Sequence, residues 1–295
     1  MSGFAIVTLG SLSPWLSLLI LLVVAFAAGM VGAALGTGGG IFLVPALVLL
    51  FGLDIHVAIA ASIVSVIATS SAAAAGDVET GLTNIRLAMF LESGTAVGGL
   101  LGAVVAVTIL ASQSNVLVLV FVPVILLGAG LMLSSRDRDI VPDPPPDPIA
   151  RRLRLDGEYV GPVTHIRRSY RVTRTPLGLV FAFFAGIASG LLGLGGGIFK
   201  VPAMNAVMNV PLRVATATST FMIGVTATAG ALVYLFAGDV ELAVAAPVIL
   251  AVFAGTVVGR RYGHRAPVGR LKLLFVGLLV AAALLMVARA AGVLA

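Results

Sequence analysis

The chain of 295 residues is 60% hydrophobic and only 10% charged, with a mean hydropathy of +1.16. Soluble domains carry roughly 25% charged residues, so the composition excludes a soluble globular protein and indicates a polytopic membrane protein. The absence of cysteine excludes disulfides and cysteine-ligated metals, and the net charge of +6 does not indicate nucleic-acid binding, because no basic face alternates with aromatic residues.

Apolar segments predict the membrane spans. In chain order they fall at about 14–35, 38–52, 56–76, 85–110, 115–134, 176–193, 196–209, 214–237, 240–259 and 269–291. Several approach the ~20 residues that cross ~30 Å of hydrocarbon. The second segment of each half is shorter and is either a full span or a half-helix, so we expect eight to ten spans and take ten. The first segment follows no basic region and precedes no small-residue cleavage site, so we interpret it as a span.

The two halves of the chain are copies. Gly38–Phe42 recurs unchanged as Gly195–Phe199, a shift of 157 residues. The same shift aligns the halves without a gap over about 80 residues, which indicates duplication. We therefore assign residues 1–134 to a first transmembrane repeat, 135–175 to a Pro/Arg-rich connector and 176–295 to a second repeat.

An odd number of segments in each half predicts that the repeats have opposite orientations. The fold class is an all-α polytopic membrane protein with two inverted repeats of about five segments each and broken helices at the Gly-rich motifs. The connector holds nine of the 18 basic residues and the loop at 260–272 holds five, so both are expected on the cytoplasmic side of the membrane. The N-terminus and the acidic loop Gly238–Glu241 then lie outside. Inverted repeats around a midplane site are a common plan of secondary transporters.

The connector contains the run Asp143-Pro-Pro-Pro-Asp147-Pro148, which favours an extended polyproline II conformation. We expect a polar segment with little packed core. A regulatory or partner-docking role is the alternative.

Two glycine-rich motifs lie at matching places, GTGGGIFLVP at Gly36–Pro45 and GLGGGIFKVP at Gly193–Pro202. Glycine runs and proline disfavour a continuous helix. Within a membrane a broken backbone is tolerated only where protein or a water-filled cavity satisfies its polar groups. A helix that begins just after each triplet would direct its free N–H groups at the break, and helix N-termini favour anions. The candidate binding residues are Gly38, Gly39, Gly40, Gly195, Gly196 and Gly197.

The alternative for glycine is close helix packing. We prefer this alternative for the pairs spaced by four, Gly98 with Gly102 and Gly255 with Gly259. We prefer binding for the triplets, because packing does not require three consecutive glycines.

Lys200 is an ionisable residue within the second motif, where the first motif has Leu43. Such a residue in a membrane segment is a functional candidate, so we expect it to complement an anion. The alternative is that its head reaches an interface while its stem stays buried. For Glu92, proton carriage competes with a structural pair with Arg86, and we prefer the pair.

Hydroxyl side chains recur on one helical face in the segment after each motif. They either donate to an oxyanion or bond neighbouring helices. Ser62 and Ser219 are the preferred candidates because they match across the repeat, and Asn205 and Asn209 are weaker candidates for lining a cavity.

The sequence predicts no catalytic or metal site. His56, His165 and His264 lie near predicted loops, and no HExxH pattern is present. We therefore expect no enzyme activity and no cofactor.

The paired G-x-G-G-G-x-x-x-V-P motifs, followed by Ala61-Ser62 in the first copy and Thr218-Ser219 in the second, resemble the TauE/SafE family of sulfite exporters, also called TSUP. The resemblance covers about Ala25–Gly102 and Ala182–Gly259. It implies transport of small sulfur-containing anions such as sulfite, sulfoacetate or other organosulfonates. The family's Thr-Ser pair is retained in the second copy only.

Together these features predict a secondary carrier that exports such an anion by alternating access. Backbone N–H groups hold the anion, Ser62, Thr218 and Ser219 add neutral donors, and Lys200 adds charge. A passive anion channel, a carrier for a small carboxylate and a membrane-embedded enzyme or assembly factor are the alternatives. The expected partners are the small anionic substrate and membrane lipid, not nucleic acid, and a homodimer is left open.

Overall fold

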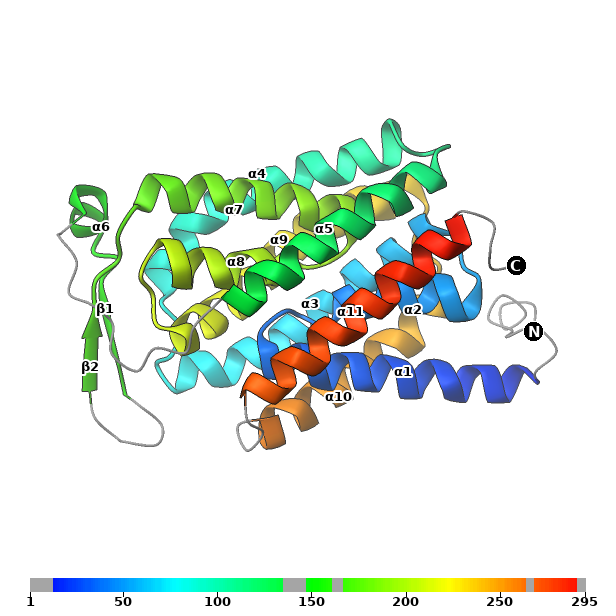
Figure 1. The fold of residues 1–295 in the computed structure, drawn as a ribbon, viewed down its shortest axis with the longest axis horizontal. Coiled ribbons are helices and arrows are strands. Elements are labelled where there is room, and N and C mark those ends of the chain that lie inside the picture. The colour runs from blue at the N-terminus through cyan, green and yellow to red at the C-terminus, as the bar shows by residue number, and fades with distance from the viewer. Residues whose placement is uncertain (1–12, 135–146, 161–166, 264–267, 291–295) are drawn as a thin grey trace.

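The computed structural model describes residues 13–134, 147–160, 167–263 and 268–290. Long helices run alongside one another, and two short strands lie at one end (Figure 1). The helices of the first repeat are α1 (Pro14–Leu35), α2 (Gly40–Phe51), α3 (Ile55–Glu79), α4 (Ile85–Thr108) and α5 (Ser114–Ser134). Those of the second repeat are α7 (Thr175–Leu192), α8 (Gly197–Pro202), the π-helix η2 (Ala203–Val207), α9 (Leu212–Ala237), α10 (Leu242–Gly263) and α11 (Val268–Ala290).

Every predicted span contains a helix, which confirms the all-α polytopic fold class. Among the described residues, seven helices are long and apolar enough to cross a membrane, namely α1, α3, α4, α5, α7, α9 and α10. The 12 residues of α2 reach only about 18 Å at 1.5 Å per residue, well short of ~30 Å of hydrocarbon. The α8–η2 segment is similarly short. The count of ten full spans is therefore too high, and the segments after the triplets are half-helices.

The two repeats run in opposite directions. The shift of 157 residues pairs α1 with α7, α2 with α8–η2, α3 with α9, α4 with α10 and α5 with α11. Helix α1 begins and α11 ends at one end of the molecule, while the strands lie at the opposite end (Figure 1). Each repeat therefore starts and finishes at opposite ends, as an inverted pair does.

Helices of the two repeats interlock in two bundles. Helix α4 of the first repeat packs along α7 and α9, and α10 of the second packs along α1 and α3. A side chain at Gly98 would collide with the carbonyl of Phe183, and one at Gly255 with the carbonyl of Phe26. The packing role preferred for these glycines is therefore confirmed. We call α1, α2, α3, α10 and α11 the α1 bundle and α7, α8, α9, α4 and α5 the α7 bundle.

The described part of the connector forms a small packed cap. It consists of α6 (Pro148–Leu153) and the antiparallel strands β1 (Gly157–Val160) and β2 (Arg167–Tyr170). Its buried residues, which pack with residues of α4 and η2, are Ala150, Leu155, Tyr159, Tyr170 and Val172. The expectation of a connector with little packed core is therefore wrong for these residues, because each short strand turns one aromatic side chain inward. The proline run Asp143–Pro146 lies outside the described residues.

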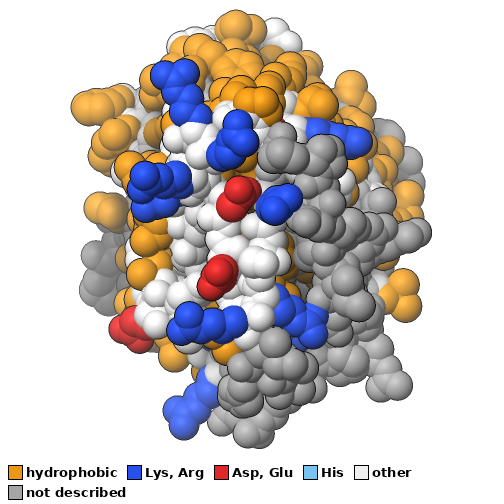
Figure 2. All heavy atoms as spheres, turned by 90° about the vertical axis from the view of Figure 1, so that its left-hand side faces the viewer, with side chains coloured by type: hydrophobic (Ala, Val, Ile, Leu, Met, Phe, Trp, Pro, Cys, Tyr) orange, Lys and Arg blue, Asp and Glu red, His pale blue; other side chains and the backbone are white. Residues whose placement is uncertain are grey.

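Arginine side chains gather on the face of the molecule that carries the cap (Figure 2). In the described sequence, arginines are frequent in the connector and also stand at the start of α4 (Arg86) and at the end of α10 (Arg260 and Arg261). Membrane proteins concentrate basic residues on the cytoplasmic side. This distribution agrees with placing the connector and the end of α10 on one side, and the cytoplasmic assignment of that side stays a prediction.

Candidate functional site

The glycine segments Gly36–Gly40 and Gly193–Gly197 meet where the two bundles join. Gly38 and Gly195 face the same two side chains, Val66 and Ile223, which lie near the middle of α3 and α9. Val66 and Ile223 are themselves 157 residues apart, so they are equivalent positions of the two repeats. The structure thus brings both predicted breaks together around the approximate two-fold relation of the repeats.

Backbone geometry gives each triplet a reason to be glycine. Gly39 and Gly196, which precede α2 and α8, have φ angles of +72° and +73°, a region that disfavours other residues. A Cβ at Gly40 would lie 2.6 Å from the carbonyl oxygen of Gly193, and one at Gly197 would lie 2.7 Å from that of Gly36. Conformation and packing alone therefore account for the glycine triplets. Packing does require three consecutive glycines here, so the reason given for preferring a binding role is wrong.

The backbone donors at the two breaks are the feature that packing does not explain. Among the described residues, no hydrogen bond is found for the N–H groups of Gly38–Ile41 or Gly195–Ile198. The first bonded N–H groups are those of Phe42 and Phe199, which donate to Gly39 and Gly196 at 3.1 Å. Residues 38–41 and 195–198 are all buried, and buried backbone donors nearly always have a partner. Eight such donors in two facing groups suit an acceptor with several lone pairs, such as an oxyanion.

Hydroxyl groups surround the same place, and the two repeats differ in how they are bonded. Ser62 Oγ donates toward the carbonyl oxygens of Gly193 at 2.9 Å and Gly40 at 3.2 Å. Its equivalent, Ser219, is fully buried and has no hydrogen-bond partner among the described residues. It lies one turn before Ile223 on α9, on the face that meets the glycine segments.

Two further buried hydroxyls without a partner in the described structure belong to Thr37 and Ser189. The Cα of Thr37 lies 2.9 Å from the position of a Cβ on Gly197, and Ser189 Cβ lies 3.3 Å from that on Gly196. Neither Thr37 nor Ser189 was predicted from the sequence as a site residue. Thr37 stood inside the first motif, and Ser189 replaces glycine, since its counterpart is Gly32.

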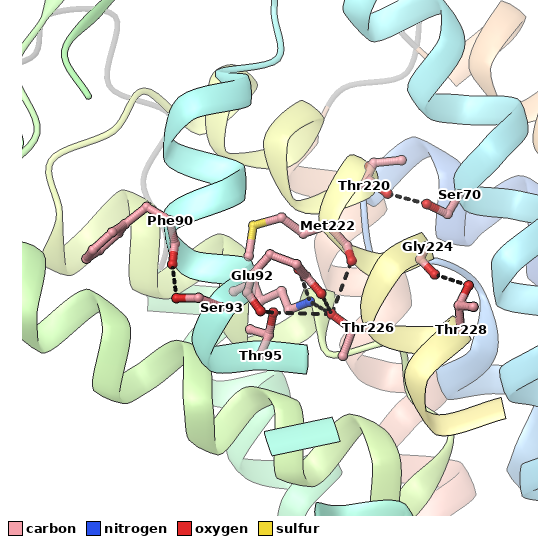
Figure 3. A network of polar contacts seen from close by, with 11 residues as sticks. Ser70, Phe90, Glu92, Ser93, Thr95, Thr220, Met222, Gly224, Thr226 and Thr228 are labelled. Atoms are coloured by element: carbon pink, nitrogen blue, oxygen red, sulfur yellow. Dashed lines mark hydrogen bonds and ion pairs between the residues drawn. The ribbon is translucent and has the colours of Figure 1, made fainter. Parts of the chain in front are cut away.

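Lys200, on α8, is buried. Its two interaction partners, Glu92 and Thr226, lie in the polar network of Figure 3. Its Nζ donates to Thr226 Oγ1 at 2.6 Å, and the Thr226 hydroxyl donates to Glu92 Oε1 at 2.7 Å. The other carboxylate oxygen of Glu92 lies 3.8 Å from Nζ. Lys200 is only 2% exposed, so the alternative in which its head reaches an interface is wrong.

Glu92 therefore pairs with Lys200 and not with Arg86, which corrects the sequence-based preference. Arg86 is exposed, and its Nη1 donates to the carbonyl of Arg154 in the cap. The pair occurs in the α7 bundle only, because the equivalent positions in the α1 bundle are Leu43 and Ile249.

Three sequence candidates lie outside this cluster. Thr218 Oγ1 accepts the backbone N–H of Asn84 at 3.0 Å, where α4 begins. Asn205 Nδ2 donates to the carbonyl of Val210 at 3.0 Å, and Asn209 Nδ2 donates to the carbonyl of Arg171 at 3.4 Å. These contacts hold loops together at the cap end. The candidate site therefore comprises the two glycine segments, Ser62, Ser219 and Lys200, with Thr37, Ser189, Glu92 and Thr226 added by the structure.

Comparison with known proteins agrees with the resemblance seen in the motifs. The family model described as sulfite exporter TauE/SafE matches residues 21–286. The probable membrane transporter protein YunE of Bacillus subtilis (strain 168) is 31% identical over 234 residues, which cover 77% of this chain and 81% of YunE. The probable membrane transporter protein YdhB of the same organism is 23% identical over 249 residues, or 84% of this chain and 91% of YdhB. No solved structure matches the chain. Because the family match spans nearly all of the membrane helices, the chain belongs to the TauE/SafE sulfite exporter family of membrane transporters.

Proposed function

We propose that this protein is a secondary transporter that exports a small sulfur-containing anion, such as sulfite or sulfoacetate, across the cell inner membrane. The observation that carries the proposal is the meeting of the two glycine segments with eight buried N–H groups that have no partner among the described residues. Four of these groups lie at the start of α2, a helix of 12 residues whose dipole favours negative charge at that end.

The chemistry around the breaks suits a compact oxyanion. Backbone N–H groups approach from both repeats, and the hydroxyls of Ser219, Thr37 and Ser189 have hydrogen-bonding capacity unused in the described structure. Lys200 supplies positive charge one turn into α8. Sulfite and sulfonates present three oxygens that can accept bonds from several directions at once. The family to which the chain belongs supports sulfur as the central atom.

Access to such a site requires the two glycine segments to separate, because a Cβ on either Gly40 or Gly197 would already meet the opposite segment. The interlocked bundles offer a means. The α1 and α7 bundles meet through α3 with α9 and through α11 with α5, so rocking at these contacts would open the site toward one end of the molecule and then toward the other. The sequence has no nucleotide-binding motif, so we assign the driving force to gradients of the anion or of a coupled ion.

Uptake into proteoliposomes tests the proposal. Radiolabelled sulfite and sulfoacetate are supplied to vesicles that contain the wild-type protein, Ser219→Ala, Lys200→Ala or the control Ser93→Ala. Ser93 is exposed on α4 and its hydroxyl bonds only the Phe90 carbonyl, so this control is expected to match the wild type. Loss of one hydrogen bond to a charged ligand costs about 1.5–3 kcal/mol, so KM is expected to rise roughly 10- to 100-fold in Ser219→Ala.

Unchanged flux in both Ser219→Ala and Lys200→Ala would contradict the assigned site. Ohmic single-channel currents with rates far above carrier turnover would assign the protein as an anion channel instead. Stronger competition by small carboxylates than by sulfonates would assign it to carboxylate transport.

A further inference from the structure

A buried ion pair lies directly beside the proposed anion site. Lys200 Cε is 3.3 Å from the position of a Cβ on Gly196, so the lysine stem packs against the second glycine segment. Glu92 approaches from α4, in the same bundle but from the other repeat. Both residues are at least nine-tenths buried.

The pair leaves part of its bonding capacity unused. Among the described residues, Lys200 Nζ makes one hydrogen bond, to Thr226, and its distance of 3.8 Å to Glu92 Oε2 exceeds hydrogen-bond length. Glu92 Oε2 has no hydrogen-bond partner among the described residues. An ammonium carries three donors and a carboxylate oxygen two acceptor sites. Lys200 is therefore able to turn toward an anion, and Glu92 Oε2 is open to a proton.

We infer that Glu92 is the proton-binding group of transport and that one proton is carried with each anion. This inference rests on the proposed function. When an anion reaches the N–H groups of the glycine segments, Lys200 pairs with it and moves from Glu92. The carboxylate of Glu92 then lacks a compensating charge in a buried place, a state that is strongly disfavoured. An O–H bond forms at Oε2 with a proton from the water on the side to which the site is open, and this proton leaves when the anion leaves.

Charge balance favours this sequence of events. Before binding, the buried charges are Lys200⁺ and Glu92⁻. After a monoanion and a proton bind, they are Lys200⁺ and the anion, while Glu92 is neutral. The number of buried charges is the same in both states, so the carrier never holds an unpaired charge within the membrane.

No other titratable side chain faces this pair from the described parts of the helices packed against it. Helices α5 and α7 contain none. On α4, Arg86 is exposed and bonds the cap. On α9, Arg213 is exposed and the Tyr234 hydroxyl donates to the Gly190 carbonyl at 3.0 Å. A proton exchanged at this place therefore belongs to Glu92 or Lys200.

The α1 bundle provides a matched control variant. It has Leu43 and Ile249 at the positions equivalent to Lys200 and Glu92 of the α7 bundle. The double variant Glu92→Ile/Lys200→Leu thus copies residues that this fold already accommodates at equivalent positions. It removes both charges together, and replacing a buried pair by apolar residues is often neutral or stabilising.

The test measures proton uptake on anion binding. Methanesulfonate, an organosulfonate monoanion, is added to the purified full-length protein in weakly buffered detergent solution at about pH 7, where its acid group is fully ionised and carries no proton. A pH indicator reports the protons taken up, and calorimetry reports the anion bound. The wild type is expected to take up about one proton per methanesulfonate. Glu92→Gln is expected to bind methanesulfonate with less than a tenth of that uptake. If Glu92→Gln does not fold, the double variant takes its place with the same expectation for the protons taken up per anion bound.

The outcomes separate the two claims. Binding of methanesulfonate by the wild type without proton uptake overturns the coupling and leaves the anion site in place. Equal uptake per bound anion by the wild type and by a folded variant without Glu92 overturns the assignment of the proton to this residue. If the wild type binds neither methanesulfonate nor sulfite, the proposed function fails, and the coupling fails with it.

Discussion

Thr69 and Thr226 are the same residue at equivalent positions, yet they serve different purposes. Thr69 Oγ1 lies 3.1 Å from the carbonyl of Gly38 and 2.8 Å from that of Val66, so it bonds backbone only. Thr226 instead lies between Lys200 and Glu92. Only the α7 bundle holds the charged pair, so the hydroxyl of Thr226 links an ammonium to a carboxylate, whereas that of Thr69 does not. Divergence of a few side chains thus made two copies of one backbone inequivalent.

Gly197→Ala tests how closely the glycine segments approach each other. The new Cβ would lie 2.7 Å from the Gly36 carbonyl oxygen and 2.8 Å from Ile223 Cδ1, so the segments would have to move apart. We expect a loss of about 1–3 kcal/mol in stability, as overpacking typically costs. Thermal unfolding in detergent measures it. Gly130→Ala is the control, since a Cβ on that helical glycine meets nothing within 4 Å and alanine favours helix by about 1 kcal/mol. Equal melting temperatures for Gly197→Ala and the wild type would contradict the described contact.

The sequence predicts that the glycine segments, Ser62 and Ser219 are neighbours, because the repeat places them at matching positions. It predicts Lys200 as a neighbour because this residue lies within the second motif. The partner of Lys200 was not predicted. Glu92 lies 108 residues before Lys200, and only the interlocking of α4 with α7 and α9 brings them together. Arg86 is closer to Glu92 in sequence, at six residues, but its side chain lies at the cap end of α4 and bonds the Arg154 carbonyl. Thr218 lies apart from the glycine segments, and its Oγ1 accepts the N–H of Asn84 in the loop before α4.

Among the elements, the cap shows how a connector is anchored. Asn84 caps α4 by accepting the N–H of Leu87 at 3.0 Å, and its Nδ2 donates to the Leu155 carbonyl at 2.7 Å and to Tyr170 Oη at 2.8 Å. Burial of the Tyr170 ring raises its pKa to about 12, although the bond from Asn84 acts in the opposite direction. The cap is thereby fixed to the end of the membrane helices.

Asp147 makes the anchoring of the cap dependent on pH. Its carboxylate caps α6 by accepting the N–H of Ile149 at 2.9 Å, and it accepts the N–H and hydroxyl of Thr175 at 2.8 Å each, where α7 begins. Burial acts to raise the pKa of Asp147, but these hydrogen bonds outweigh it and hold the pKa below the usual 3.8. Ionised Asp147 therefore stabilises the cap at pH values above its ordinary pKa. This stabilisation is lost as the pH falls through the lower pKa that Asp147 has in the folded state.

We therefore expect the amide protection of Ile149 and Thr175 to be constant from about pH 7 to about pH 5 and to decrease below about pH 4. Hydrogen exchange, corrected for the intrinsic rate at each pH, measures it. The variant Asp147→Asn is expected to show weaker protection at about pH 7 and no acid transition at these amides. The same acid transition in Asp147→Asn would assign the effect to another group.

The half-helices α2 and α8 follow from sequence because glycine and proline have strong backbone preferences. The cap could not be predicted in this way. Its strands are four residues long and each has only one buried side chain, so no clear period is visible. Its burial depends on contacts with α4 and η2, which are distant in sequence.

For the whole molecule, inversion of the repeats predicts which loops face which side of the membrane. The chain has no cysteine, so single cysteines report accessibility without background. We expect Asp239→Cys, in the loop between α9 and α10, to react with a membrane-impermeant maleimide added to intact cells. Glu158→Cys, in the cap, is expected to react only after the membrane is opened. Labelling of both positions from the same side would contradict the inverted arrangement.

Anomalous diffraction from crystals soaked in selenite would locate an oxyanion bound by the two glycine segments. Selenite has the shape and charge of sulfite, and selenium scatters anomalously. We expect a peak within hydrogen-bond reach of the N–H groups of Gly38–Ile41 or Gly195–Ile198, and we expect this peak to be weaker or absent in Ser219→Ala. A selenite ion bound only among the arginines of the cap, at concentrations that saturate transport, would contradict it.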